Sequence, residues 1–270
     1  MFAWALKEKR KKWGIDANPF TGFGQAEKES SSRRPFTPDE LRMLLSHKDY
    51  QKRHFRSRHA FWLIPLGAFT GARLGELCQL DLKDFVEVEG IPCLDINDTE
   101  ATEEQVVDGR RKHVKNANAK RLVPIHPELI RMGLLEYVAE LRAAGQSPHL
   151  FPGLSRKHRD GPAHPASKWF ADFRHAAGLT EKQATVFHSL RHLFITTILD
   201  AGTAPHMLAP IVGHEAKLVT DKVYWNTRDA TKRLPTVEAF TLPDDIISMF
   251  PRYNAVTFTK QRGTRPSERT

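Results

Sequence analysis

The sequence is poor in cysteine and contains no long apolar run, and both shortages limit what the protein can be. Its two cysteines, Cys78 and Cys93, form neither a zinc motif nor a disulfide framework, and both lie in apolar stretches. We therefore expect two buried free thiols, as in a reducing compartment. No stretch approaches 18 consecutive apolar residues, and the N-terminus lacks the apolar region of a signal peptide. These absences favour a soluble, cytoplasmic protein without a membrane partner.

Acidic residues are too few to balance the basic ones. Lysine and arginine total 41 against 32 aspartates and glutamates, which gives a formal net charge of +9 and a pI near 9.6. This balance favours a polyanionic partner, with nucleic acid as the leading candidate, although a solvated basic surface has the same composition. Hydrophobic residues make up 40% of the 270, so the chain can form a proper core.

The N-terminal region divides into a short helix, a linker and the start of a larger domain. Residues 1–12 predict a basic amphipathic helix that needs a partner, so we expect it to be the last helix of a missing N-terminal module. Residues 14–34 are rich in Gly, Ser, Pro and charge, which is typical of a linker. Thr37-Pro38-Asp39-Glu40 then begins a helix, with Thr as N-cap and Pro at the first helical position. A buried helix from about His59 to Phe69 and a short one from Arg73 to Leu80 follow.

The middle of the chain alternates between apolar and polar residues, which predicts strands. Phe85–Glu89 and Ile91–Ile96 alternate around a turn at Gly90. Residues 97–110 are acidic and predict an exposed loop. Lys112–Lys115 and Arg121–Ile125 predict two more strands, joined by turn residues. The expected result is a small antiparallel sheet with a basic hairpin tip.

Helical patterns resume after the sheet and continue to about residue 224. The expected helices are Pro127–Ala144, Ser167–Ala177, about Val186–Ala201, Pro205–Val212 and Lys217–Tyr224. Beyond Asn226 the periodic signal weakens, and we expect the last ten or so residues to be disordered.

The helix near residue 190 carries the most unusual side chains. His188, Arg191 and His192 lie at i, i+3 and i+4 and so share one helix face, whereas Phe187, Leu190 and Phe194 form a second stripe that can face a core. The two histidines have the spacing of a zincin metal pair, so a zinc site is one interpretation. Ser189 stands where the zincin glutamate would be, and Arg191 would place a positive charge beside a dication, which argues against it.

Two other basic groups could bind an anion. Arg73 follows a glycine turn at a helix start, where the helix dipole disfavours a cation, so a bound anion would explain it. The alternative is a surface arginine paired with Glu76. Lys115 lies on the expected hairpin tip, where a long flexible side chain can reach a nucleic-acid groove or can simply be solvated.

Taken in order, these motifs resemble those of the tyrosine recombinases, the phage-integrase family. The sequence carries Gly-Ala-Arg73-Leu-Gly-Glu-Leu, a hairpin lysine before Arg-Leu-Val-Pro, His188-Ser-Leu-Arg191-His, Gly-His214 and Tyr224. The resemblance runs from about Pro35 to Trp225. It implies an α+β fold of the DNA breaking–rejoining type, a mainly helical catalytic domain with a small antiparallel β-sheet. Residues 35–226 would form this domain, 1–34 the remnant of a core-binding domain and linker, and 227–270 a tail.

The resemblance also implies a chemistry that needs no metal, cofactor or ATP. Tyr224 would attack a DNA phosphodiester to give a 3′-phosphotyrosine, and His188 would take its proton. Two arginine forks would hold the phosphate oxygens, and a lysine would protonate the departing 5′-oxygen. The implied catalytic residues are Arg73, Lys115, His188, Arg191, His214 and Tyr224, with Glu76 and His192 in support. The implied partners are double-stranded DNA and other protomers in a synaptic complex, as a tetramer on DNA.

Several alternatives stay open at this point. A type IB-like topoisomerase uses the same chemistry, a non-catalytic DNA-binding module could keep the fold, and a zinc hydrolase could use His188, His192 and His214. Lys112 and Lys120 flank Lys115, so any of the three could be the general acid. The tail could dock on a neighbouring protomer or pack in cis.

Overall fold

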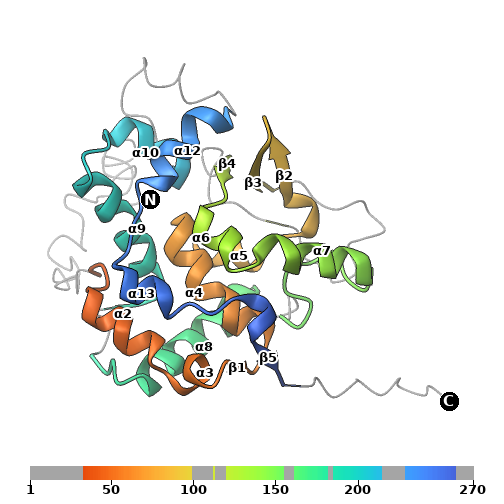
Figure 1. The fold of residues 1–270 in the computed structure, drawn as a ribbon, viewed down its shortest axis with the longest axis vertical. Coiled ribbons are helices and arrows are strands. Elements are labelled where there is room, and N and C mark those ends of the chain that lie inside the picture. The colour runs from red at the N-terminus through yellow and green to blue at the C-terminus, as the bar shows by residue number, and fades with distance from the viewer. Residues whose placement is uncertain are drawn as a thin grey trace, which may run out of the picture. The chain divides into compact units, whose positions relative to one another are not determined.

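Helices dominate the structure, and a three-stranded sheet lies at one side of them (Figure 1). The computed structural model describes residues 33–98, 112, 120–154, 161–181, 185–214 and 229–259. The expected α+β class, mainly helical with a small antiparallel sheet, is therefore confirmed. The expected helices at 1–12 and 217–224, most of the acidic loop and the last eleven residues lie outside the described residues. The expected strand Lys112–Lys115, except Lys112, and the basic hairpin tip after it also lie outside them.

The first described helix begins as the sequence predicts. α2 (Pro38–Leu45) starts after Thr37, whose hydroxyl accepts from the Glu40 N–H at 3.2 Å, while the Glu40 carboxylate accepts from the Thr37 N–H at 2.9 Å. This reciprocal capping box satisfies two N–H groups that the helix itself cannot. Leu41, Leu44 and Leu45 then face the core. A short α3 (Lys48–Gln51) and a two-residue strand β1 (His54–Phe55) follow.

The core is organised around α4 (Arg58–Thr70) and α9 (His188–Asp200). Every residue of α4 from Ala60 to Thr70 is buried, as expected for a helix that is apolar all round. The stripe of Phe187, Leu190 and Phe194 is buried, which confirms the predicted core face of α9. A Cβ added at Gly67 would lie 2.7 Å from the Phe187 ring, and one at Gly71 2.5 Å from the Phe194 ring. The two glycines therefore allow α9 to approach α4 closely.

The sheet has the order β2-β3-β4 and is antiparallel throughout. β2 (Phe85–Val88) and β3 (Ile91–Ile96) form the expected hairpin, in which both turn residues, Glu89 and Gly90, have positive φ. β4 (Arg121–Pro124) pairs with β3 so that Arg121 lies opposite Ile96. This register places Arg121 at the end of the strand, beside the helices.

The predicted helix Pro127–Ala144 is wrong in one respect, because the structure divides it into α6 (Pro127–Arg131) and α7 (Leu134–Ala144). Gly133 separates them with φ +91°, a backbone conformation that ends a helix. The Met132 carbonyl there accepts a hydrogen bond from the Tyr253 N–H at 2.7 Å, so the break receives the C-terminal segment.

Four more helical segments lie among the described residues before residue 214. Their bounds are α5 (Leu74–Cys78), the 3-10 helix η1 (Leu82–Asp84), α8 (Ala163–Ala176) and α10 (Pro205–Val212). The last matches its predicted bounds, and Gly213 ends it with φ +67°. The expected helix from Arg73 to Leu80 is shorter than predicted, and Arg73 precedes its first turn.

Residues 229–259 pack on the same chain, which is one of the two alternatives that the sequence left open for the tail. They form α12 (Ala230–Glu238), α13 (Asp244–Ser248), the 3-10 helix η4 (Tyr253–Ala255) and β5 (Thr257–Phe258). Phe240 contacts Phe69 and Phe194 at ring distances of 5.3 and 5.1 Å. β5 runs parallel to β1, on the side of the helices away from α10 and α12 (Figure 1).

Cys78 and Cys93 are both free and buried, as expected. Among the described residues, no helix is long and apolar enough to cross a membrane.

Candidate functional site

Among the predicted site residues that the structure describes, Arg191 is the most deeply buried, with 2% of its surface exposed. Its guanidinium donates to two backbone carbonyls, from Nη1 to Gly71 at 2.7 Å and from Nη2 to Val212 at 2.5 Å. These carbonyls lie two residues before Arg73 and two residues before His214. Arg191 therefore ties both loops that carry predicted site residues to the first turns of α9.

Arg73 lies beside Glu76, as the surface-pair alternative expects, but the pair is not a simple surface contact. The Glu76 carboxylate accepts from both the Arg73 N–H and Arg73 Nη1, each at 2.8 Å. Glu76 is buried, whereas the Arg73 side chain keeps 28% of its surface exposed. The carboxylate thus caps the start of α5 and at the same time holds the arginine.

A third arginine, Arg121, completes this cluster, although its sequence context predicts only the start of a strand. Arg121 Nη1 and Nη2 donate to the two Glu76 oxygens at 3.1 and 2.7 Å, and its Nε donates to the Ile211 carbonyl at 2.6 Å. One feature of the sequence could have revealed this role. Arg121 lies in an otherwise apolar strand, and an arginine that is buried there needs a carboxylate partner.

The charges of this cluster shift the acidity of its members. Burial alone would raise the pKa of Glu76, but the guanidiniums of Arg121 and Arg73 outweigh it and lower the pKa to about 2. Burial, followed by the positive charges of Arg73 and Arg121, lowers the pKa of Arg191 to about 9. At neutral pH the cluster holds three cations and one carboxylate, so it is net positive.

The three predicted histidines face the same positive charges. Burial, with His192, Arg191 and Arg73 next, lowers the pKa of His188 to about 4. The pKa values of His192 and His214 are also lowered, by burial and then by Arg191. The rings of His188 and His192 lie edge to face, 4.9 Å apart. The His188 imidazole is therefore neutral at pH 7 and can accept a proton or a hydrogen bond, and the lowered pKa values of His192 and His214 favour their neutral forms as well.

The three candidate lysines differ in their surroundings. Lys112 is buried and its ammonium lies 2.9 Å from Asp81 and 2.5 Å from Asp84, both also buried. Lys120 is half-exposed and lies 2.6 Å from Asp98. Lys115 lies outside the described residues. Two of the three alternatives are thus engaged by carboxylates.

The tyrosines also differ in burial and in hydrogen-bond partners. The sequence has four, and Tyr224 lies outside the described residues. Tyr50 and Tyr137 are buried in the core, and burial raises the pKa of both phenols well above the usual range. Tyr253 donates to Glu140 at 2.7 Å, and burial together with this carboxylate raises its pKa to about 12. None of these three phenols is activated as a nucleophile.

The donor set for a metal is incomplete where the structure is described. Within the described ranges, no group of three or more His, Cys, Asp or Glu side chains is placed to hold a metal ion. The zinc-hydrolase alternative needs such a set from His188, His192 and His214. Ser189, in the position of the zincin glutamate, instead accepts from the Val186 N–H at 3.1 Å.

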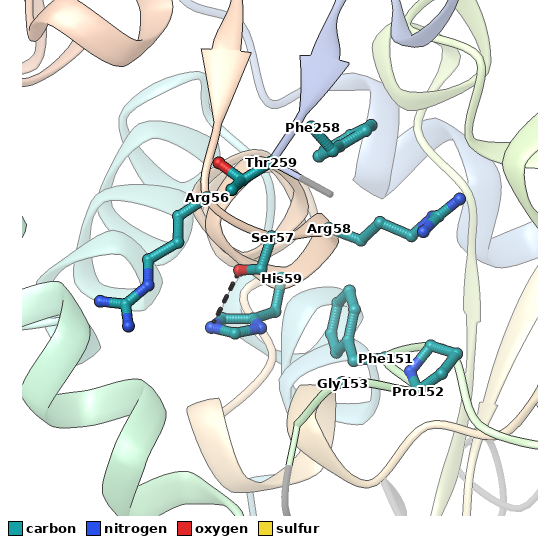
Figure 2. Close-up of a pocket in the computed structure, with 9 residues that line it drawn as sticks. All are labelled: Arg56, Ser57, Arg58, His59, Phe151, Pro152, Gly153, Phe258 and Thr259. Atoms are coloured by element: carbon teal, nitrogen blue, oxygen red, sulfur yellow. Dashed lines mark hydrogen bonds between the residues drawn. The ribbon is translucent and has the colours of Figure 1, made fainter. Parts of the chain in front are cut away.

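A pocket elsewhere on the molecule contains none of the predicted site residues. It lies beside β1 and β5, where Phe151 and Phe258 face Arg58 and His59 (Figure 2). The Ser57 hydroxyl lies 3.2 Å from His59 Nε2, but it also accepts from the Ala60 N–H as the N-cap of α4. Burial, followed by Arg56, lowers the pKa of His59 to about 4. We interpret this serine–histidine pair as structural.

Comparison with known proteins identifies one family. The model described as "Phage integrase family" matches residues 34–231, which is well over half of the chain. Every predicted site residue lies within the matched range. No curated protein sequence matched the chain.

Three solved structures are similar to parts of this chain, each with a TM-score below 0.5. The integrase from mycobacterium phage Brujita is 20% identical, with 92% of this chain and 72% of that one covered and a TM-score of 0.47. The Tn1549 transposon integrase, solved with transposon right end DNA, is 18% identical, with coverages of 86% and 72% and a TM-score of 0.48. XerA recombinase is 22% identical over 72% of this chain, with a TM-score of 0.45. The match spans 59% of the XerA recombinase chain, less than two thirds of its length.

Proposed function

Because the chain belongs to the phage integrase family, we propose that it is a site-specific DNA recombinase that cleaves and rejoins DNA through a 3′-phosphotyrosine. The observation that carries the proposal is the pair of bonds from Arg191 to Gly71 and Val212. These bonds hold the segments that lead to Arg73 and to His214 against α9, the helix that also carries His188. A cluster of cations and neutral imidazoles is what a phosphodiester needs at its transition state.

The two arginines have the first role in the proposed mechanism. Attack on a phosphodiester gathers negative charge on the non-bridging oxygens, and planar guanidinium forks bind such oxygens with paired hydrogen bonds. Arg73 and Arg191 would supply these forks. His214 would donate a further hydrogen bond to the scissile phosphate. Since the groups are already held by the protein, little reorganisation is needed when the charge develops.

Tyr224 is the proposed nucleophile, and the other tyrosines support this choice by their surroundings. Tyr50 and Tyr137 are buried, and Tyr253 is bonded to a carboxylate that disfavours the phenolate. A phenol has an unperturbed pKa near 10 and needs help to ionise. His188 is neutral at pH 7 because burial and nearby cations lower its pKa to about 4, so it can accept the proton. A bound phosphate adds negative charge and raises this pKa, which improves the base.

Lys115 is the proposed general acid. Lys112 is held by two buried aspartates and Lys120 by Asp98, so each would have to leave a carboxylate to reach the phosphate. In the proposed step, the Tyr224 oxygen forms a bond to phosphorus, the bond to the 5′-oxygen breaks, and Lys115 protonates that oxygen. The covalent phosphotyrosine keeps the energy of the phosphodiester, so another 5′-hydroxyl reverses the step without ATP.

Double-stranded DNA and further protomers are the proposed partners. The net charge of +9 supports the first of these, since phosphate neutralisation dominates DNA affinity. Exchange between two duplexes requires several active sites, which supports a synaptic assembly, as a tetramer on DNA. A type IB-like topoisomerase would relax supercoils without such an assembly, and a non-catalytic module would bind DNA without cleaving it.

The proposal includes a mobile DNA element as the substrate of the recombinase, and a nicked suicide duplex that carries the end sequence of that element tests it. Loss of the short fragment beside the nick traps the covalent intermediate, so we expect a protein–DNA adduct that survives detergent. Tyr224→Phe should form none, while EDTA should leave the wild-type yield unchanged. DNA binding without any adduct would favour the non-catalytic module instead. Relaxation of a supercoiled plasmid without sequence preference would favour the topoisomerase.

A further inference from the structure

Arg121 links three elements of the site although it is almost fully buried, with 4% of its surface exposed. It begins β4, and its guanidinium donates to Glu76 in α5 through both Nη atoms. Its Nε donates at 2.6 Å to the Ile211 carbonyl in the last turn of α10. The next carbonyl, that of Val212, receives Arg191. Two arginines thus hold the end of the helix that leads to His214.

The shared oxygen of Glu76 shows what Arg121 does for Arg73. Glu76 Oε1 accepts from Arg73 Nη1 at 2.8 Å and from Arg121 Nη1 at 3.1 Å. Arg73, Glu76 and Arg121 together carry one net positive charge. Without Arg121 the Glu76 carboxylate would be neutralised by Arg73 alone, and the net charge of the group would fall to zero. An arginine bound in that way has less electrostatic attraction left for a phosphate.

We propose that Arg121 is a positioning residue for DNA cleavage, which neutralises Glu76 so that Arg73 keeps its charge for the scissile phosphate. This inference rests on the proposed function of the site. Arg121 itself is buried, with its donors directed at Glu76 and at the Ile211 carbonyl, and is not assigned a contact with DNA. Its effect is therefore expected in the cleavage step and not in the initial binding of the duplex.

A purely structural role would look different, and the chain offers a matched control. Arg142 is a partly buried arginine that donates from Nη2 to the carbonyls of Leu82 and Phe85, each at 2.8 Å, beside the sheet and away from the cluster. Arg142→Met removes carbonyl bonds of the same kind as the Arg121–Ile211 bond. Any loss that comes only from such bonds should appear in both variants.

The test compares Arg121→Met, Arg121→Lys and the double variant Glu76→Gln/Arg121→Met. Single-turnover adduct formation is measured on the suicide duplex, below the melting temperature of every variant. Displacement within an active site costs about 10²-fold in rate, so we expect a loss of about that size for Arg121→Met. Arg142→Met should stay near the wild-type rate. The affinity for uncleaved DNA should hardly change in either variant.

The double variant separates charge balance from structure. Glu76→Gln removes the carboxylate that would otherwise neutralise Arg73, so the group regains its single positive charge. We expect the double variant to cleave about tenfold or more faster than Arg121→Met. If the double variant is as slow as Arg121→Met, or slower, the inference is overturned. Wild-type cleavage by a folded Arg121→Met overturns it as well.

Two further measurements keep the test decisive. If Arg121→Met unfolds at the assay temperature, Arg121→Lys replaces it, because lysine keeps the charge but loses the bond to Ile211. A rate within about tenfold of wild type then supports charge balance, and a loss beyond about 10²-fold contradicts it.

If the wild-type protein itself forms no adduct, the proposed function fails. Titration with inorganic phosphate then tests the role of Arg121 independently of cleavage. Arg121→Met should bind phosphate about tenfold more weakly than wild type, and the double variant should recover the phosphate affinity. Equal phosphate affinities of wild type and Arg121→Met would overturn the inference.

Discussion

The Arg191 guanidinium donates to the Gly71 carbonyl at 2.7 Å, across 120 residues of sequence. This bond joins the first turns of α9 to the turn that precedes Arg73. The same guanidinium reaches the Val212 carbonyl before His214. The shape of the site therefore depends on one planar, multidentate side chain.

Arg191→Lys is the first prediction. An ammonium cannot hold two carbonyls and a phosphate in the geometry of a guanidinium fork, so we expect single-turnover adduct formation to fall about 10²- to 10³-fold. Arg142→Lys changes a distant arginine in the same way and should leave the rate close to wild type. A wild-type rate from Arg191→Lys would mean that Arg191 is a structural cation only.

Gly71→Ala is predicted to lower the unfolding free energy more than Gly145→Ala does. Gly71 and Gly145 have nearly the same backbone conformation, with φ +59° and +61°, but a Cβ at Gly145 meets nothing within 4 Å. Gly145→Ala should therefore lose only the left-handed strain, about 1–2 kcal/mol. At Gly71 the Phe194 ring adds an overpacking cost of about 1–3 kcal/mol. Urea unfolding measures both, and equal losses would show that the ring moves aside freely.

The buried Glu76 carboxylate predicts a pH dependence of stability. Its pKa is lowered from the ordinary value of 4.5 to about 2 by Arg121 and Arg73, which outweigh burial. A lowered pKa stabilises the folded state above about 4.5, and this contribution is lost as the pH falls towards 2. The whole effect is on the order of 3 kcal/mol. The stability difference between wild type and Glu76→Gln, from urea unfolding, should therefore narrow between pH 5 and pH 3. A constant difference would contradict the assigned shift.

Substitution of Lys112 should reduce stability, whereas substitution of Lys115 should reduce the rate of cleavage. Lys112→Met leaves Asp81 and Asp84 buried without their cation, so we expect a loss of about 3–5 kcal/mol in unfolding free energy. Lys115→Met should leave stability nearly unchanged but slow cleavage about 10²- to 10⁴-fold, the range for general acids.

A duplex with sulfur in place of the 5′-bridging oxygen provides the matching control for these lysines. A thiolate departs without a proton at neutral pH, because its pKa is about 8.5. This substrate should restore cleavage by Lys115→Met and leave any defect of Lys112→Met in place. Rescue of Lys112→Met alone would transfer the acid role to Lys112.

Local signals in the sequence predicted much of the framework. The Thr37 capping box, the all-apolar α4, the Gly90 hairpin and the core stripe of α9 each follow from residues close together in the chain. The family motifs likewise proposed Arg73, His188, Arg191 and His214 as site residues, and their roles remain predictions. In the structure, Arg191 bonds to the backbone just before Arg73 and just before His214. The spacing of the motifs in the sequence could not show that Arg191 reaches the other motifs through the backbone carbonyls of Gly71 and Val212.

Features that depend on distant partners were missed or misjudged. The helix break at Gly133 receives Tyr253, more than a hundred residues later, and the pattern of apolar residues continues across it. β1 and β5 have two residues each, too few for a periodic signal. The role inferred for Arg121 depends on its hydrogen bonds to Glu76 and to the Ile211 carbonyl, which lie 45 and 90 residues away in the sequence. Residues 99–111, 113–119 and 215–228, with Lys115 and Tyr224, lie outside the described residues, so their roles stay proposals.

The central claim is that Tyr224 becomes covalently bound to DNA. Its most direct test is to trap the adduct on the suicide duplex, digest protein and DNA, and find by mass spectrometry the peptide that carries the nucleotide. The account predicts a phosphotyrosyl linkage on the peptide that contains Tyr224, and none in the Tyr224→Phe protein. A nucleotide on any other residue, or an adduct that persists in Tyr224→Phe, would contradict it.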